Sequence, residues 1–325
     1  MQFTDLEFRL LIFVRKAKAL VLRTRTMRGQ RFLARKKASQ RREFDKLSRR
    51  FSSYYQTISG FSFEKFVTPL WNDFNIRAEK VFLPSPSFSF LNDETIMLTM
   101  FGGSSYKEEM RYLEKSYKKT ELSRLLFEDY VGDPLLVSNK YITSFNSIRQ
   151  LYLLSLFLKK VKLPPDTLST VVEWGGGYGN MAKLLLRLST KPMTYILTDT
   201  PLFCCLQWLY LATVMGAKKV NMITTPKDRI RKGKVNIIPV GILDSFTNQL
   251  NADLFISTWG LSESSKFSQD FVAKRKWFRA KHIFLGYQRS SQNLPTAEYV
   301  GELAKKNGAT IEPLSILPNN SLAFQ

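Results

Sequence analysis

The pattern of apolar and polar positions changes at about Pro165. Before it, apolar residues recur at helical spacing, which predicts helices over residues 107–130 and 145–160. After it, short apolar runs alternate with helical stretches. Strands are predicted at 168–174, 194–198, 235–240, 254–258 and 282–286, with helices at 181–188 and 203–215. This alternation predicts an α/β fold with a doubly wound, mostly parallel sheet and helices on both faces.

The first 165 residues divide further by composition. Residues 5–50 contain few helix breakers and predict one or two basic helices, whereas Gly102-Gly103 predicts a turn. We therefore expect three segments. They are a basic helical arm at 1–50, a mostly helical cap or substrate region at 51–162, and the α/β domain at 163–325.

Charge is the abnormal feature of the composition. The chain carries 49 Lys and Arg against 27 Asp and Glu, a net charge of +22. Residues 1–50 hold 16 of the basic and four of the acidic residues, so the arm alone contributes +12. Such an arm can lie on an anionic membrane surface, bind nucleic-acid phosphates, or form a solvated helical extension. Charge alone leaves the three open.

Targeting and redox signals favour a cytoplasmic protein. The apolar clusters of the arm are interrupted by Arg15, Lys16 and Lys18, unlike the unbroken core of a signal peptide, and no run approaches the roughly 20 apolar residues of a membrane span. The two cysteines, Cys204 and Cys205, are adjacent and give no disulfide framework. We expect a cytoplasmic location in which the arm can contact the inner face of the membrane.

The stretch VVEWGGGYGN (171–180) is the clearest candidate for chemistry. It predicts a strand, a glycine-rich turn that a ligand can approach closely, and a helix beginning near Met181. A dinucleotide-binding turn needs Gly or Ala where this chain has Asn180. Glu173, directly before the turn, would repel a phosphate and attract a cation.

The arrangement Glu173, Gly175, Gly177, Gly179 resembles motif I of the S-adenosylmethionine-dependent methyltransferases. This resemblance implies a Rossmann-like class I fold and S-adenosylmethionine as cofactor, with Glu173 near its amino group. Asp199 follows Gly179 by 20 residues, at the end of the next strand, where it would accept the ribose hydroxyls. Asp244 follows a later strand and is a candidate for the adenine edge.

Three more segments resemble the sugar O-methyltransferases of bacterial surface-polysaccharide clusters. They are NSIRQLYLLSLF (146–157), TDTPLFCCLQWLYL (198–211) and DLFISTWGLSES (253–264). The resemblance covers roughly residues 125–290. It implies methyl transfer to a sugar hydroxyl of a surface or capsular glycan, or of its lipid-linked precursor. The C-terminal ILPNNSLAFQ lacks the His-containing segment expected there, and the basic arm has no counterpart.

A sugar hydroxyl is a weak acid, so a base near the cofactor is expected to assist its removal. Glu263 is the first candidate, and the only histidine, His282, is the second. Trp259 and Tyr287 are candidates for stacking on the sugar or the adenine. One histidine and no close carboxylate cluster predict no metal site. The alternatives are an RNA methyltransferase gripping phosphates with its arm, and a non-catalytic binding module of the same fold.

Overall fold

The computed structural model describes residues 13, 14, 17, 31–100, 106–138 and 140–325. The predicted turn at Gly102-Gly103 and most of residues 1–30 lie outside them. The described α-helices are α2 (Arg31–Ser48), α3 (Phe51–Ile58), α4 (Pro69–Phe82), α5 (Glu94–Met100), α6 (Lys107–Ser116), α7 (Lys119–Leu126), α8 (Phe145–Lys160), α9 (Asn180–Leu188), α10 (Pro201–Met215), α11 (Lys266–Lys274), α12 (Lys276–Arg279) and α13 (Tyr299–Lys306). The described strands are β1 (Leu136–Ser138), β2 (Thr143–Ser144), β3 (Thr170–Trp174), β4 (Thr194–Asp199), β5 (Val220–Met222), β6 (Val235–Pro239), β7 (Leu254–Thr258), β8 (His282–Gln288), β9 (Thr310–Pro313) and β10 (Asn320–Phe324).

The central sheet has eight strands in the order β5-β6-β4-β3-β7-β8-β10-β9. Strands β3 to β8 run parallel, and β10 is antiparallel to both of its neighbours. The chain builds outward from β3 on one side and then returns to its other side with β7. Open α/β sheets bind their ligands at the carboxyl ends of the strands where the order reverses in this way. The predicted doubly wound, mostly parallel sheet is confirmed.

The sheet separates two apolar cores. Val171 packs in one core with Leu197, whereas the next residue, Val172, packs in the other with Ile196. Helices α8, α9 and α10 belong to the first core, and α11 and α13 to the second. Because the central strands are covered on both faces, their sequences are continuous apolar runs rather than alternating ones.

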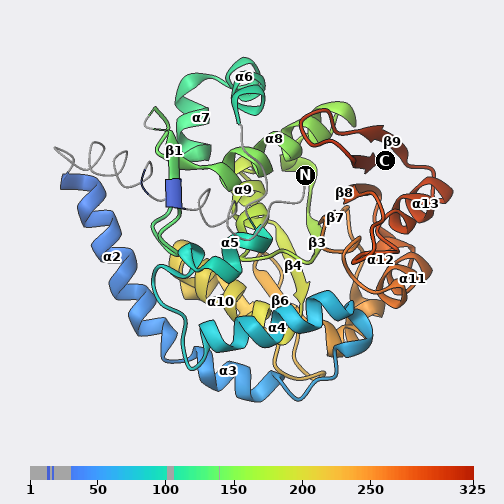
Figure 1. The fold of residues 1–325 in the computed structure, drawn as a ribbon, viewed down its shortest axis with the longest axis horizontal. Helices are drawn as coiled ribbons and strands as arrows, with labels where there is room; N and C mark the ends of the chain where they lie inside the picture. Colours follow the sequence, from blue (N-terminus) through green and yellow to red (C-terminus); the bar gives the residue numbers. More distant parts are fainter. Residues whose placement is uncertain (1–12, 15–16, 18–30, 101–105, 139) are drawn as a thin grey trace.

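An outer layer of N-terminal helices covers α10. That helix is buried continuously from Pro201 to Thr213, since it contacts the sheet on one side and α2 and α3 on the other. Figure 1 shows α2 and α3 in blue along the outside of the molecule next to α10. Leu33, Phe44 and Leu47 are the apolar residues that α2 buries. None of the helices in the described ranges is long and apolar enough to cross a bilayer.

Part of the predicted arm is therefore packed into the fold. Besides its apolar contacts, α2 places Lys36 Nζ 3.0 Å from Asp129 Oδ1, and Gln40 Nε2 donates to the same oxygen at 2.8 Å. The outer face of α2 is basic, with Arg35, Arg42 and Lys46 exposed at a spacing that aligns them in one stripe. The segment boundaries at 50 and 162 stay predictions.

The single helix predicted over residues 107–130 is wrong. The structure has two helices, α6 and α7, and an extended segment after Leu126. The break falls at Tyr117, whose backbone is extended (φ −125°, ψ 148°) and whose hydroxyl is 2.7 Å from Ser155 Oγ on α8. Tertiary contacts thus override the helical periodicity. The helix predicted over 145–160 is confirmed as α8.

Candidate active site

A cavity of about 400 Å³ opens at the carboxyl ends of β3, β4 and β7. Two of its walls follow strands. The β3–β4 wall consists of Glu173, the glycine turn and Asp199, and the β7 wall consists of Trp259 and Glu263 together with Trp71 from α4. The first turns of α8 complete the lining. The cavity therefore lies where the strand order reverses, at the ligand crevice expected of an open α/β sheet.

The glycine turn brings two loops into direct backbone contact. Gly175 has φ +72°, and a Cβ on it would lie 2.8 Å from the Cα of Gly260, which follows β7. Gly177 also lies in the left-handed region, at φ +58°. Both positions favour glycine, because a side chain would be strained at these φ values, and at Gly175 it would also fill the close approach to Gly260. Helix α9 starts directly after the turn, at Asn180.

Glu173 is a buried carboxyl without a cationic partner among the described residues. Its Oε2 accepts a hydrogen bond of 2.7 Å from the Tyr195 hydroxyl. Burial raises the pKa of Glu173 to about 8, and the nearby charge of Asp199 acts in the same direction, while the Tyr195 bond opposes them. Glu173 is therefore mostly neutral at pH 7, and a cation entering the cavity would favour its ionised form.

Asp199 is held rigidly at the end of β4. Thr200 N donates to its Oδ1 at 2.9 Å, and Gln207 Nε2 donates to its Oδ2 at 2.8 Å. Burial raises the pKa of Asp199 to about 7 against these hydrogen bonds. Gln207 also donates to the carbonyl of Gly177 at 3.1 Å, so one amide connects the carboxyl to the glycine turn. Gln207 lies within the segment 198–211 that resembles the sugar O-methyltransferases, and that resemblance implied no role for its side chain.

Glu263 is fixed by groups from distant parts of the chain. Its Oε2 accepts a hydrogen bond of 3.1 Å from Trp71 Nε1, and the amide of Gln288 also bonds to the carboxyl. Burial raises the pKa of Glu263 to about 7 in spite of both bonds. Thr68 Oγ1 donates to the Glu263 carbonyl, and Ser265 N donates to the carbonyl of Phe66. Sequence reasoning missed Trp71, because 192 residues separate it from its partner.

Trp259 is the other predicted residue of the β7 wall that the structure brings to the cavity. Its indole Nε1 donates to Asn320 Oδ1 at 2.7 Å. Its backbone has φ +68°, a conformation that is strained for a bulky residue and that recurs at functional sites. The indole is therefore held in place by the C-terminal strand β10.

Three predicted residues do not line this cavity. His282 begins β8 at the far end of the strand, with Nδ1 3.1 Å from the carbonyl of Gln325. Tyr287 is buried in the second core against Gly301 of α13. Asp244 is exposed on the 3₁₀ helix η5 (Val240–Gln249) and forms an ion pair with Arg275. The structure thus places these three residues in packing or surface contacts outside this cavity.

The carboxyl groups that line the cavity fit a ligand that carries a cation and hydroxyl groups. The buried carboxyl of Glu173 suits an ammonium group, and Asp199 suits a pair of hydroxyls. The residues from 31 onward that the structure describes contain no group of three or more His, Cys, Asp or Glu that could hold a metal ion.

No protein-family model and no curated protein matches the chain. Solved structures that resemble it include Aeropyrum pernix fibrillarin with bound S-adenosylmethionine, at TM-score 0.36 and 10% identity over 53% of this chain and 73% of that one. An O-methyltransferase from Bacillus cereus in complex with SAH has TM-score 0.38 and 8% identity over 73% and 97%. An O-methyltransferase family protein from Burkholderia thailandensis has TM-score 0.36 and 12% identity over 77% and 81%. Likenesses at these scores carry no argument, so the function is inferred from the geometry of the site.

Proposed function

We propose that this chain is an S-adenosylmethionine-dependent O-methyltransferase. One observation carries the proposal: a single cavity joins Glu173, the glycine turn and Asp199 to the carboxyl of Glu263. Glu173 would bind the amino group of the cofactor, Asp199 the ribose hydroxyls, and the glycine turn would allow close approach of the backbone. Glu263 then remains as the group that serves the acceptor.

When bound, the cofactor supplies a methyl group on a sulfonium sulfur, which leaves as a neutral thioether. The described residues of the chain provide orientation and a proton acceptor. Glu263 takes the proton of the attacking hydroxyl on its carboxylate. A pKa of about 7 suits this task, because a base near the working pH is both available and strong enough to act. Trp71 and Gln288 hold the carboxylate in place, and the restricted cavity keeps the reactants aligned.

We infer a sugar hydroxyl as the acceptor. The indoles of Trp71 and Trp259 offer flat apolar faces, and Asn146, Gln150, Gln288 and Asn320 line the same cavity with amides that can donate and accept. This mixture suits a ring with one apolar face and many hydroxyls. The three segments that resemble the sugar O-methyltransferases support the same acceptor, as part of a surface or capsular glycan or its lipid-linked precursor.

The basic stripe on α2 is proposed to rest on an anionic membrane surface at the cytoplasmic face. Arg35, Arg42 and Lys46 are exposed, and the opposite side of α2 is packed on α10. A helix that is packed on the protein and exposes its basic side chains can approach a planar anionic surface without unfolding. A lipid-linked sugar acceptor would be found at such a surface.

Calorimetric titration of S-adenosylmethionine and S-adenosylhomocysteine tests the proposal directly. Wild-type protein is expected to bind both at micromolar concentration. Gly177→Asp, which strains the turn, and Asp199→Ala, which removes the ribose ligand, are expected to abolish binding without unfolding the protein. Asp244→Ala, outside the cavity, is the matched control and should bind as wild type does. Absence of heat with wild-type protein would overturn the proposed methyltransferase activity and favour a non-catalytic binding module. Salt-sensitive binding of RNA without binding of glycans would favour the RNA methyltransferase.

A further inference from the structure

One face of the first turns of α8 completes the cavity. Phe145, Asn146, Arg149 and Gln150 lie at helical positions i, i+1, i+4 and i+5, and all four line it. The helix begins at this end, capped by Ser144, whose Oγ accepts from the amide of Ser147. The positive end of its backbone dipole is therefore at the cavity. The acceptor proposed above uses the amides of Asn146 and Gln150 on this face, and Arg149 has so far no role.

Arg149 is the only cationic side chain among the described residues that line the cavity. It is 7% exposed, and its guanidinium lies 4.7 Å from the ring centre of Phe145. Its Nε and Nη2 both contact Glu109 Oε1 at 2.8 Å. Within the described chain, no acceptor is bonded to its Nη1, so part of the five-donor fork is left for a ligand. An oriented, buried guanidinium of this kind is suited to a carboxylate or phosphate.

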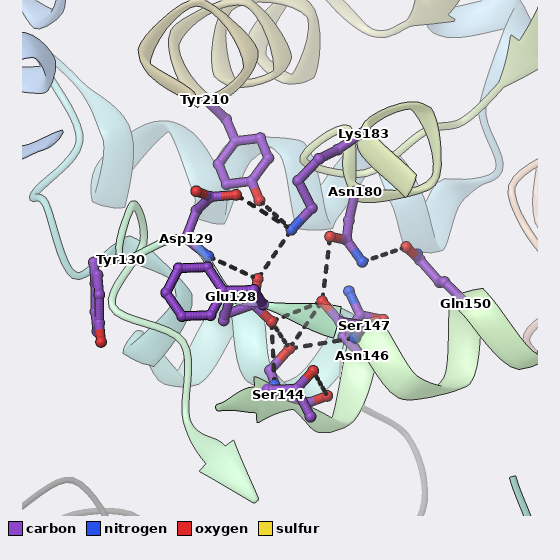
Figure 2. Close-up of polar contacts among 12 residues, drawn as sticks. Glu128, Asp129, Tyr130, Ser144, Asn146, Ser147, Gln150, Asn180, Lys183 and Tyr210 are labelled. Carbon is purple, nitrogen blue, oxygen red and sulfur yellow. Dashed lines mark hydrogen bonds and ion pairs between the residues drawn. The ribbon is translucent and has the colours of Figure 1, made fainter. Parts of the chain in front are cut away.

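A buried polar network joins the start of α8 to the start of α9, the helix that follows the glycine turn (Figure 2). At its centre, Lys183 of α9 pairs with Glu128 at 2.9 Å, and both side chains are 2% exposed. The other oxygen of Glu128 accepts from Ser147 of α8 at 2.7 Å. Asn180, the first residue of α9, donates to Gln150 Oε1 at 2.7 Å. These contacts thus fix the first turn of α9 and the first turns of α8 relative to each other.

The opposite charges of the lining match a zwitterion. The β3–β4 wall presents the carboxyls of Glu173 and Asp199, and the face of α8 presents one guanidinium. An α-amino acid group carries an ammonium and a carboxylate on one carbon, and so needs one partner of each sign close together. Glu173 provides the first partner, and Arg149 is the available second.

We propose that Arg149 binds the α-carboxylate of the cofactor's amino acid group, opposite the Glu173 site for its ammonium. The inference rests on the proposed function and deepens it, since it assigns a specificity element to the cofactor site. Glu109 orients the guanidinium, and Phe145 supports its flat face. The alternative partner of Arg149, an anionic group on the acceptor, is an outcome of the test.

The test compares three ligands by calorimetry. S-adenosylhomocysteine has both charges, its decarboxylated analogue S-adenosyl-3-thiopropylamine has only the ammonium, and 5′-methylthioadenosine has neither. Wild-type protein is expected to prefer S-adenosylhomocysteine over the decarboxylated analogue by tenfold to about a hundredfold, the range for hydrogen bonds to a charged group. No such preference in wild-type protein would overturn the inference.

The variants are chosen so that loss of Arg149 does not leave Glu109 as a buried carboxylate without its cationic partner. In Glu109→Leu/Arg149→Met, both members of the buried pair become apolar groups of similar length, a replacement that folded proteins tolerate. The preference for the carboxylate is expected to fall to within about threefold of unity, with 5′-methylthioadenosine bound as in wild type. Glu109→Gln keeps the guanidinium and should keep the preference.

The outcomes separate the two proposals. If wild-type protein binds none of the three ligands, the proposed function itself fails. If it binds S-adenosylhomocysteine and the double variant retains the full preference, Arg149 does not read the carboxylate and the inference fails alone. If the double variant no longer binds 5′-methylthioadenosine, Glu109→Gln/Arg149→Gln decides, because it keeps polar groups at both positions and removes the guanidinium: a reduced preference supports the inference, and an unchanged one overturns it.

Discussion

The β3–β4 wall and the β7 wall of the cavity are assembled over very different lengths of chain. Glu173, the glycine turn, Asp199 and Gln207 fall within 35 consecutive residues of one strand–helix–strand–helix unit. Glu263 instead depends on Trp71, which lies 192 residues away. The first wall is shaped mainly by backbone conformation, and the second by side chains that meet only in the folded protein. The proposed cofactor site is therefore local in the sequence, whereas the proposed acceptor site depends on the whole fold.

The largest expected effect separates the two walls by function. Glu263→Gln removes the proton acceptor and should lower kcat by 10² to 10⁴, the usual contribution of a positioned base. In wild-type protein kcat should rise through about pH 7 as Glu263 ionises, and this step should vanish in the variant. Steady-state kinetics with a methylated-glycan readout measures both. Binding of S-adenosylhomocysteine should stay within twofold, and a parallel loss of binding would show that the walls are not separable.

The second effect concerns the buried network that joins α8 to α9, behind the β3–β4 wall. Lys183→Met leaves Glu128 buried and unpaired, and should lower the free energy of unfolding by about 3–5 kcal/mol. Urea denaturation monitored by circular dichroism measures the loss. The double variant Glu128→Gln/Lys183→Met, which removes both charges, should recover most of it. Equal destabilisation in the two variants would mean that the side-chain hydrogen bonds, rather than the ion pair, stabilise this region.

The third effect is a pH dependence of the β3–β4 wall. Binding of an ammonium group requires ionised Glu173, whose pKa is raised to about 8, so the affinity for S-adenosylhomocysteine should increase about tenfold per unit between pH 5.5 and 7.5. In the absence of ligand, the stability of the folded protein changes with pH in the opposite direction, because the folded state favours neutral Glu173. Its contribution to stability is complete below pH 4.5 and is lost as the pH rises to about 8.

Calorimetry in buffers of different ionisation enthalpy would detect the proton released on binding. Glu173→Gln should bind weakly and with a flatter pH profile. Retention of the full slope in that variant would assign the titration to Asp199, whose pKa of about 7 falls in the same window.

The smallest effect lies outside both walls. Arg42→Ala, on the exposed stripe of α2, should weaken binding to vesicles containing phosphatidylserine about fivefold, as expected for one basic side chain near an anionic surface. Lys305→Ala on α13, which Figure 1 shows on the opposite side of the molecule, is the charge-matched control. Vesicle co-sedimentation measures the difference, and equal binding by the two variants would argue against the stripe as the contact.

The sequence predicted the fold best where burial is continuous. Strands β3, β4, β7 and β8 are covered on both faces, so their apolar runs are visible without any partner, and the glycine turn has a signature of its own. The antiparallel β9 and β10 were not predicted, because pairing at the C-terminal edge of a sheet depends on neighbours rather than on pattern. The break at Tyr117 was missed for the same reason.

The candidate site shows the same division. Glu173, Gly175 and Asp199 reach the cavity because the carboxyl ends of adjacent parallel strands meet at one edge. Tyr287 does not, because strand alternation places it with Ile283 and Leu285 in the second core. Arg149 could have been suspected only as the one charged residue of α8 before its last turn, and its proposed role depends on a cavity that the sequence does not show.

The packing of α2 against the rest of the fold has a practical consequence for the design of shorter forms of the protein. Lys36 and Gln40 both contact Asp129, which is 3% exposed and also pairs with Arg187 near the Glu128–Lys183 contact. Deletion of residues 1–50 would remove two partners of this buried carboxylate and expose the apolar side of α10. Loss of activity or membrane association in such a protein would report damage to its interior. Deletion of residues 1–30 keeps the described contacts of α2 with Asp129 and α10. The first useful deletion boundary therefore falls before Arg31.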